Sequence, residues 1–152
     1  MPASSLSLRL TATAIGCGIA RLFADAGALT AEELAGYRLF KSLGCVSCHQ
    51  GVNLGGNMYQ RHGIFHPLAS PEPEIVRVPS LRNVAATSPY FHDGNAATLP
   101  RVVNAMGLAQ FDRVLTDDET KAIVAFLDTV TGRPLGRPLT PARRSSQQAA
   151  PR

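Results

Sequence analysis

The chain has 152 residues, of which 45% are hydrophobic and 17% charged, a balance that suits one modest globular domain. The net charge of +4 comes from residues 133–152, which hold five arginines and no acid, so that residues 1–132 alone carry a net charge of −1. No apolar run approaches the roughly 20 residues that cross a bilayer, so we expect no membrane span. No motif that reads the grooves of DNA or RNA is present, so we expect no nucleic-acid partner.

Residues 1–28 have the outline of a signal peptide. Arg9 precedes a mildly apolar run of small residues, and both Ala24-Asp25-Ala26 and Ala26-Gly27-Ala28 fit an A-x-A cleavage pattern. A lipoprotein-type site at Cys17 and the remnant linker of a longer chain are alternative interpretations. The signal-peptide interpretation predicts export.

Residues 29–132 are expected to fold as one helical domain with three helices. The first begins at a capping box formed by Thr30 and Glu33 and stops at Gly44. The second can be capped by Thr98, carries Leu99, Val102, Val103 and Met106 on one face, and is expected to end at Gly107. The third begins at a capping box formed by Thr116 and Glu119 and closes before Gly132.

About fifty residues between the first two helices are dense in Gly, Pro and Asn. Structureless loops of this length are unusual in a compact domain, and a large apolar ligand would explain how they stay folded. No convincing alternating strand pattern is present, so the fold class predicted is all-α with long ordered loops. Residues 133–152, rich in Pro, Arg and Ser, are expected to form a disordered basic tail.

The stretch GCVSCHQG at residues 44–51 holds the C-x-x-C-H pattern typical of haem c attachment. Two intervening residues let the thiols of Cys45 and Cys48 reach both vinyl groups of one porphyrin. His49 then lies under the iron as an axial ligand. A zinc site that adds His62 and His66 at H-x₃-H spacing is one alternative. A redox C-x-x-C is the other, although the βαβ context of that motif is absent.

The sixth coordination position decides whether such an iron can bind peroxide or only transfers electrons. The candidates are Met58, Met106, His62, His66 and His92. Met106 has the strongest local argument, because it lies on the apolar face of a helix that would press against haem. Its thioether would also raise the iron potential. A methionine at such a position is nevertheless often core filler, and the sequence alone leaves the choice open.

Four ordered segments resemble the C-terminal half of bacterial di-haem cytochrome c peroxidases. They are ALTAEELAGYRLFKSLGCVSCHQGVNLGGNMYQRHG, RVPSLRNVAATSPYFHDGNAATL, VVNAMG and LTDDETKAIVAFLDTVTG, and they span residues 28–132. The resemblance implies a cytochrome c-like haem domain with one covalent haem c in the periplasm. It also implies that Cys45 and Cys48 hold the haem, that His49 is the proximal ligand and that Met106 is the distal ligand. Thr87 and Pro89 would contribute backbone carbonyls to a calcium ion.

The chain contains one C-x-x-C-H, whereas members of that family carry a second one in an N-terminal domain where peroxide is reduced. We therefore expect a mono-haem electron carrier that passes single electrons towards hydrogen peroxide reduction. Its redox partners would be a small cytochrome or cupredoxin donor and a peroxide-reducing haem domain encoded in trans. The alternatives are a peroxidase acting at its own haem, with His92 as acid–base group, and a truncated, non-functional half. Loss of Met106 is expected to open the iron.

Overall fold

The computed structural model describes residues 29–68 and 73–132. The expected signal peptide or remnant linker at residues 1–28 and the expected disordered tail at residues 133–152 lie outside the described residues. The bounds 29–132 for the haem domain stay a prediction.

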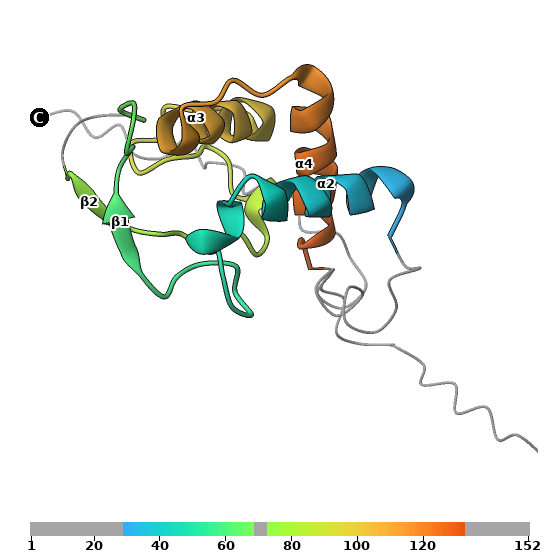
Figure 1. Cartoon of the computed structure of the whole chain (residues 1–152). Helices are drawn as coiled ribbons and strands as arrows, with labels where there is room; N and C mark the ends of the chain where they lie inside the picture. The colour runs from blue at the N-terminus through green and yellow to red at the C-terminus, as the bar shows by residue number, and fades with distance from the viewer. Residues whose placement is uncertain (1–28, 69–72, 133–152) are drawn as a thin grey trace, which may run out of the picture.

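The described part of the chain is built on three helices joined by long loops (Figure 1). These helices are α2 (Ala31–Ser42), α3 (Leu99–Phe111) and α4 (Asp117–Thr129). Short 3₁₀ turns at Cys45–Ser47 and Val84–Ala86 and two strands, β1 (Tyr59–Arg61) and β2 (Ile75–Arg77), punctuate the loops. The all-α expectation is confirmed, and no helix of the described residues is long and apolar enough to cross a membrane.

Both expected capping boxes are present. Thr30 Oγ1 accepts from the Glu33 N–H at 3.2 Å, and the Thr30 N–H donates to Glu33 Oε2 at 2.7 Å. Thr116 and Glu119 make the same pair of hydrogen bonds at 3.2 and 3.0 Å. These bonds satisfy N–H groups that the first turn of a helix leaves without partners, and they fix where α2 and α4 begin. Thr98 precedes α3 but makes no side-chain cap hydrogen bond.

Thr116→Ala is therefore expected to lower the free energy of unfolding by about 1 kcal/mol, the usual value of an N-cap hydroxyl. Thr98→Ala is the matched control, because its hydroxyl caps nothing, and the loss there should be clearly smaller. Denaturant unfolding of the two haem-loaded variants measures the difference. Equal losses would mean that the capping bond of Thr116 contributes nothing.

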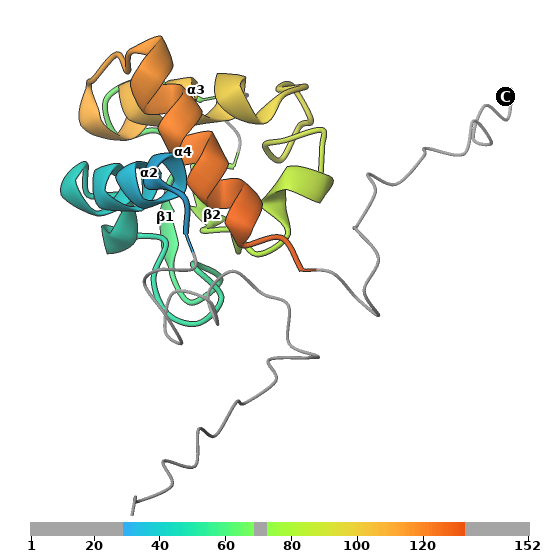
Figure 2. The ribbon, with the colours of Figure 1, turned by 90° about the vertical axis from the view of Figure 1, so that its right-hand side faces the viewer.

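Helices α2 and α4 cross in close contact (Figure 2), and their facing side chains belong to a core that α3 and the loops also share. The rings of Phe40 and Phe126 lie 5.3 Å apart at the crossing, and Phe126 is 1% exposed. Gly36 lies where the backbones meet, because a Cβ built on it would stand 1.8 Å from the Ala122 carbonyl oxygen. The close approach of the two helix backbones therefore requires a glycine at position 36.

The expectation that Gly107 ends the second helix is wrong. Helix α3 continues to Phe111, and Asp112, with φ of 52°, forms its C-cap. Gly107 is buried inside the helix, and a Cβ there would lie 2.9 Å from Leu115 Cγ and 3.0 Å from the Arg113 carbonyl oxygen. This glycine makes room for the turn between α3 and α4 and is not a stop signal.

The long loop contains a two-stranded antiparallel ribbon, which the sequence pattern did not predict. Strands β1 and β2 pair Tyr59 with Arg77, Gln60 with Val76 and Arg61 with Ile75. Strands of three residues are too short for an alternating pattern to stand out. Residues of both strands line the large cavity of the domain, so the ribbon forms part of its wall.

Candidate haem site

A cavity of about 580 Å³ lies between the helices and the loop. Its volume falls within the range of roughly 300–1,000 Å³ typical of cofactor sites. Residues from α2, α3, α4, the ribbon and the loop segments line it, and most of its wall is apolar. The apolar lining includes Phe40, Leu43, Val76, Val78, Leu81, Val84, Phe91, Leu99, Val102, Val103, Leu115, Ile123 and Leu127.

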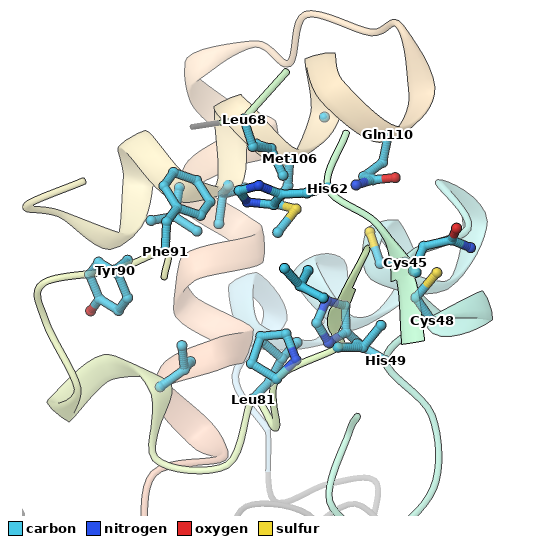
Figure 3. Close-up of a pocket in the computed structure, with 18 of the residues that line it drawn as sticks. Cys45, Cys48, His49, His62, Leu68, Leu81, Tyr90, Phe91, Met106 and Gln110 are labelled. Atoms are coloured by element: carbon cyan, nitrogen blue, oxygen red, sulfur yellow. The ribbon is translucent and has the colours of Figure 1, made fainter. Parts of the chain in front are cut away.

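The two thiols of the motif reach the same side of this cavity (Figure 3). Gly44, with φ of +89°, turns the chain out of α2, and Cys45–Ser47 then forms a single 3₁₀ turn. The His49 N–H donates to the Cys45 carbonyl at 3.0 Å, which closes the turn. One turn therefore brings Cys45, Cys48 and His49 to one end of the cavity, as attachment of a single porphyrin requires.

His49 is held in the tautomer that an iron ligand needs. Its Nδ1 lies 3.2 Å from the Leu54 carbonyl oxygen, and because a carbonyl only accepts, Nδ1 carries the proton. The other nitrogen, Nε2, is left as the ligating atom. Burial lowers the pKa of the imidazole, against the opposing effect of the Leu54 and Pro79 carbonyls, and so favours the neutral form. Gly55 is needed beside it, since its φ is +124° and a Cβ there would lie 2.2 Å from the Pro79 carbonyl oxygen, as well as 3.2 Å from His49 Nδ1.

Met106 enters the cavity from the side opposite His49 (Figure 3). It stands within α3, and the whole apolar face expected from the sequence, Leu99, Val102, Val103 and Met106, lines the cavity. An imidazole and a thioether thus face the same apolar space, with two thiols at one end. These residues fit a covalently attached haem and its iron.

The other candidates for the sixth position fall into two groups. Met58, His62 and His92 line the cavity. His66 does not, because its Nε2 contacts Asp112 Oδ1 at 2.8 Å, at the C-terminus of α3. Of the H-x₃-H pair, His62 therefore lines the cavity, whereas His66 bonds to Asp112 at the end of α3.

The zinc and redox alternatives find no support in this geometry. Within residues 29–68 and 73–132, no three His, Cys, Asp or Glu side chains gather as a metal-binding group. Burial raises the pKa of the Cys45 thiol to about 11. A redox C-x-x-C needs a thiolate of lowered pKa, so this environment works against that chemistry.

Thr87 and Pro89 both line the cavity, next to the 3₁₀ turn at Val84–Ala86. The Thr87 hydroxyl donates to the Val84 carbonyl at 3.0 Å. That the backbone carbonyls of Thr87 and Pro89 bind a calcium ion stays a prediction.

Several lining residues were not identified from the sequence. Leu81 and Phe91 come from the loop, and no periodic pattern marks them. Gln110 also lines the cavity, and its spacing of four from Met106 could have identified it as a residue of the same helix face. Leu81 and Phe91 thus complete the parts of the wall that the three helices do not supply.

Fold and site together define a c-type cytochrome domain, and comparisons with known proteins agree. The family described as Cytochrome c matches residues 34–131. Cytochrome c551 peroxidase of Nitrosomonas europaea is 45% identical over 122 residues, 71% of this chain and 36% of that protein. Cytochrome c551 peroxidase of Pseudomonas aeruginosa is 37% identical over 147 residues, 84% of this chain and 42% of that protein.

Among solved structures, a MauG-like protein associated with microbial copper homeostasis is similar, with a TM-score of 0.63 and 25% identity. The alignment covers 79% of this chain and 53% of that one. The chain belongs to the cytochrome c family, and the resemblance to di-haem cytochrome c peroxidases is confirmed. A cytochrome c domain implies covalently bound haem c. The chain spans less than half the length of these two curated relatives.

Proposed function

We propose that this domain is an electron-transfer unit, with iron held between His49 and Met106, that passes single electrons towards hydrogen peroxide reduction. The observation that carries the proposal is the placement of an imidazole and a thioether on opposite sides of one apolar cavity. The haem supplies a one-electron couple, and His/Met ligation raises its potential. With both axial positions filled by these side chains, the site would favour electron transfer over peroxide binding.

The residues around the haem serve this role in separate ways. The Leu54 carbonyl fixes the His49 ring, and the apolar wall would limit the access of water to a bound iron. Val46, between the attachment cysteines, is 37% exposed, so a partner can approach the attachment edge. We expect a small cytochrome or cupredoxin as donor, a peroxide-reducing haem domain as acceptor, and a periplasmic location.

Met106→Ala tests the proposal. The ferric wild type should show the weak long-wavelength band of methionine–iron ligation, and the variant should lose it. Its midpoint potential should fall by a sizeable part of the roughly 0.8 V over which axial ligands set haem potentials. Absorption spectroscopy and a redox titration of the haem-loaded protein measure both effects.

Met58→Ala is the matched control, because Met58 also lines the cavity. The control should keep the band and the potential. A band that survives in Met106→Ala and disappears in Met58→Ala would move the distal ligand to Met58. A high-spin ferric wild type that responds to peroxide would support the rival function, a peroxidase at this haem, for which His92 on the cavity wall would be the acid–base candidate.

A further inference from the structure

A second ligating side chain enters the cavity beside Met106. His62 follows strand β1, and its backbone N–H donates to the Glu74 carbonyl at 2.8 Å. In Figure 3 its imidazole lies next to the Met106 side chain, on the side of the cavity opposite His49. An imidazole nitrogen binds haem iron at least as readily as a thioether.

The segment that carries His62 is fastened to the same helix that carries Met106. Four contacts join residues 61–66 to the C-terminal part of α3. Gln110 Nε2 donates to the Arg61 carbonyl at 3.5 Å, and the N–H groups of Phe65 and His66 both donate to the Ala109 carbonyl, at 2.8 and 3.4 Å. The fourth joins His66 Nε2 to Asp112 Oδ1 at 2.8 Å. Because these contacts lie on both sides of His62 in the sequence, its backbone is held at a fixed place relative to Met106.

The ring of His62 is also supported. It packs edge-on against the His92 ring, with centroids 4.6 Å apart, and against the Phe91 ring at 6.4 Å. Phe91 has φ of 64°, a strained value for a phenylalanine, so the loop here is shaped by its packing. The imidazole is therefore placed by its neighbours and is not a loose surface side chain.

We propose that His62 is a reserve distal ligand, which takes the sixth iron position when Met106 does not hold it. This inference rests on the proposed function, in which Met106 is the ligand of the resting protein. Exchange of thioether for imidazole would lower the iron potential while leaving the site filled. Loss of Met106 would then not open the iron, which amends the expectation drawn from the sequence.

The spin state of four haem-loaded proteins tests the proposal: wild type, Met106→Ala, Met106→Ala with His62→Leu, and Met106→Ala with His92→Phe. We expect Met106→Ala to lose the methionine–iron band and remain low-spin in absorption and EPR spectra. Adding His62→Leu should convert it to high-spin. His92→Phe keeps an aromatic ring against His62 and should leave the low-spin state intact.

A high-spin Met106→Ala protein would overturn the proposal, and so would a conversion caused by His92→Phe but not by His62→Leu. Added imidazole should return the His62→Leu double variant to low spin, which shows that its haem pocket is folded. The wild-type spectrum tests the proposed function separately. If the wild type lacks the methionine band, the assignment of Met106 fails whatever the variants show.

Discussion

Replacing Cys45 and Cys48 together by alanine is expected to abolish covalent haem attachment and to leave the domain without a cooperative fold. The pocket that the haem would fill has a volume of about 580 Å³ and a largely apolar wall drawn from all three helices and the loops. Without the haem this wall would be exposed to water, and each large apolar side chain that loses its burial forfeits about 1.5–3 kcal/mol. Because whole domains are stable by only about 5–15 kcal/mol, we expect the polypeptide not to fold cooperatively without the haem.

The test is expression of the variant with a c-type maturation system, followed by haem staining of a denaturing gel and near-UV circular dichroism. Val46→Ala is the control, since Val46 lies between the cysteines and is not among the residues that line the cavity. The control should stain and keep its near-UV signal. A variant without haem that still unfolds cooperatively would show that the loops need no cofactor.

Local sequence signals predicted the helices well where the physics is local. The capping boxes at Thr30 and Thr116 marked the starts of α2 and α4 because a hydroxyl and a carboxylate three residues apart suffice for them. The predicted end of α3 at Gly107 was wrong because the role of this glycine is not local. Its role depends on Leu115, eight positions later in the chain, and a glycine required by a distant contact looks the same as a glycine that ends a helix.

The residues of the site also fall into those that a local sequence pattern identifies and those that distant contacts place. Cys45, Cys48 and His49 are adjacent in the chain, so one motif identifies them, and the helical periodicity identified the face of Met106. His62 was named among the candidate ligands, but its position beside Met106 depends on the β1–β2 ribbon and on contacts to α3. Such a placement arises from pairing between distant segments, which single-sequence patterns do not encode.

Gly36→Ala is the second change for which we expect a large effect. It should destabilise the domain, whereas replacing glycine by alanine inside a helix usually stabilises it. In an ordinary helix interior, alanine is more favourable than glycine by about 1 kcal/mol. At position 36 the added Cβ would lie 1.8 Å from the Ala122 carbonyl oxygen and 2.5 Å from its carbon. A backbone carbonyl inside α4 cannot move away alone, so the helices must separate. We expect the free energy of unfolding to fall by about 3 kcal/mol, the upper end for overpacked cores.

Ala35→Gly is the matched control, because residue 35 is the exposed neighbour on the same helix and the substitution runs in the opposite direction. It should cost about 1 kcal/mol, the ordinary helix-propensity difference. Guanidinium unfolding of the two haem-loaded variants compares them directly. The separation caused by Gly36→Ala should also reach the haem, because the α2 residue Phe40 has its ring centroid 6.4 Å from that of His49. The absorption spectrum of Gly36→Ala should therefore change, while that of Ala35→Gly should not. A Gly36→Ala protein as stable as wild type would show that the crossing of α2 and α4 is looser than this geometry requires.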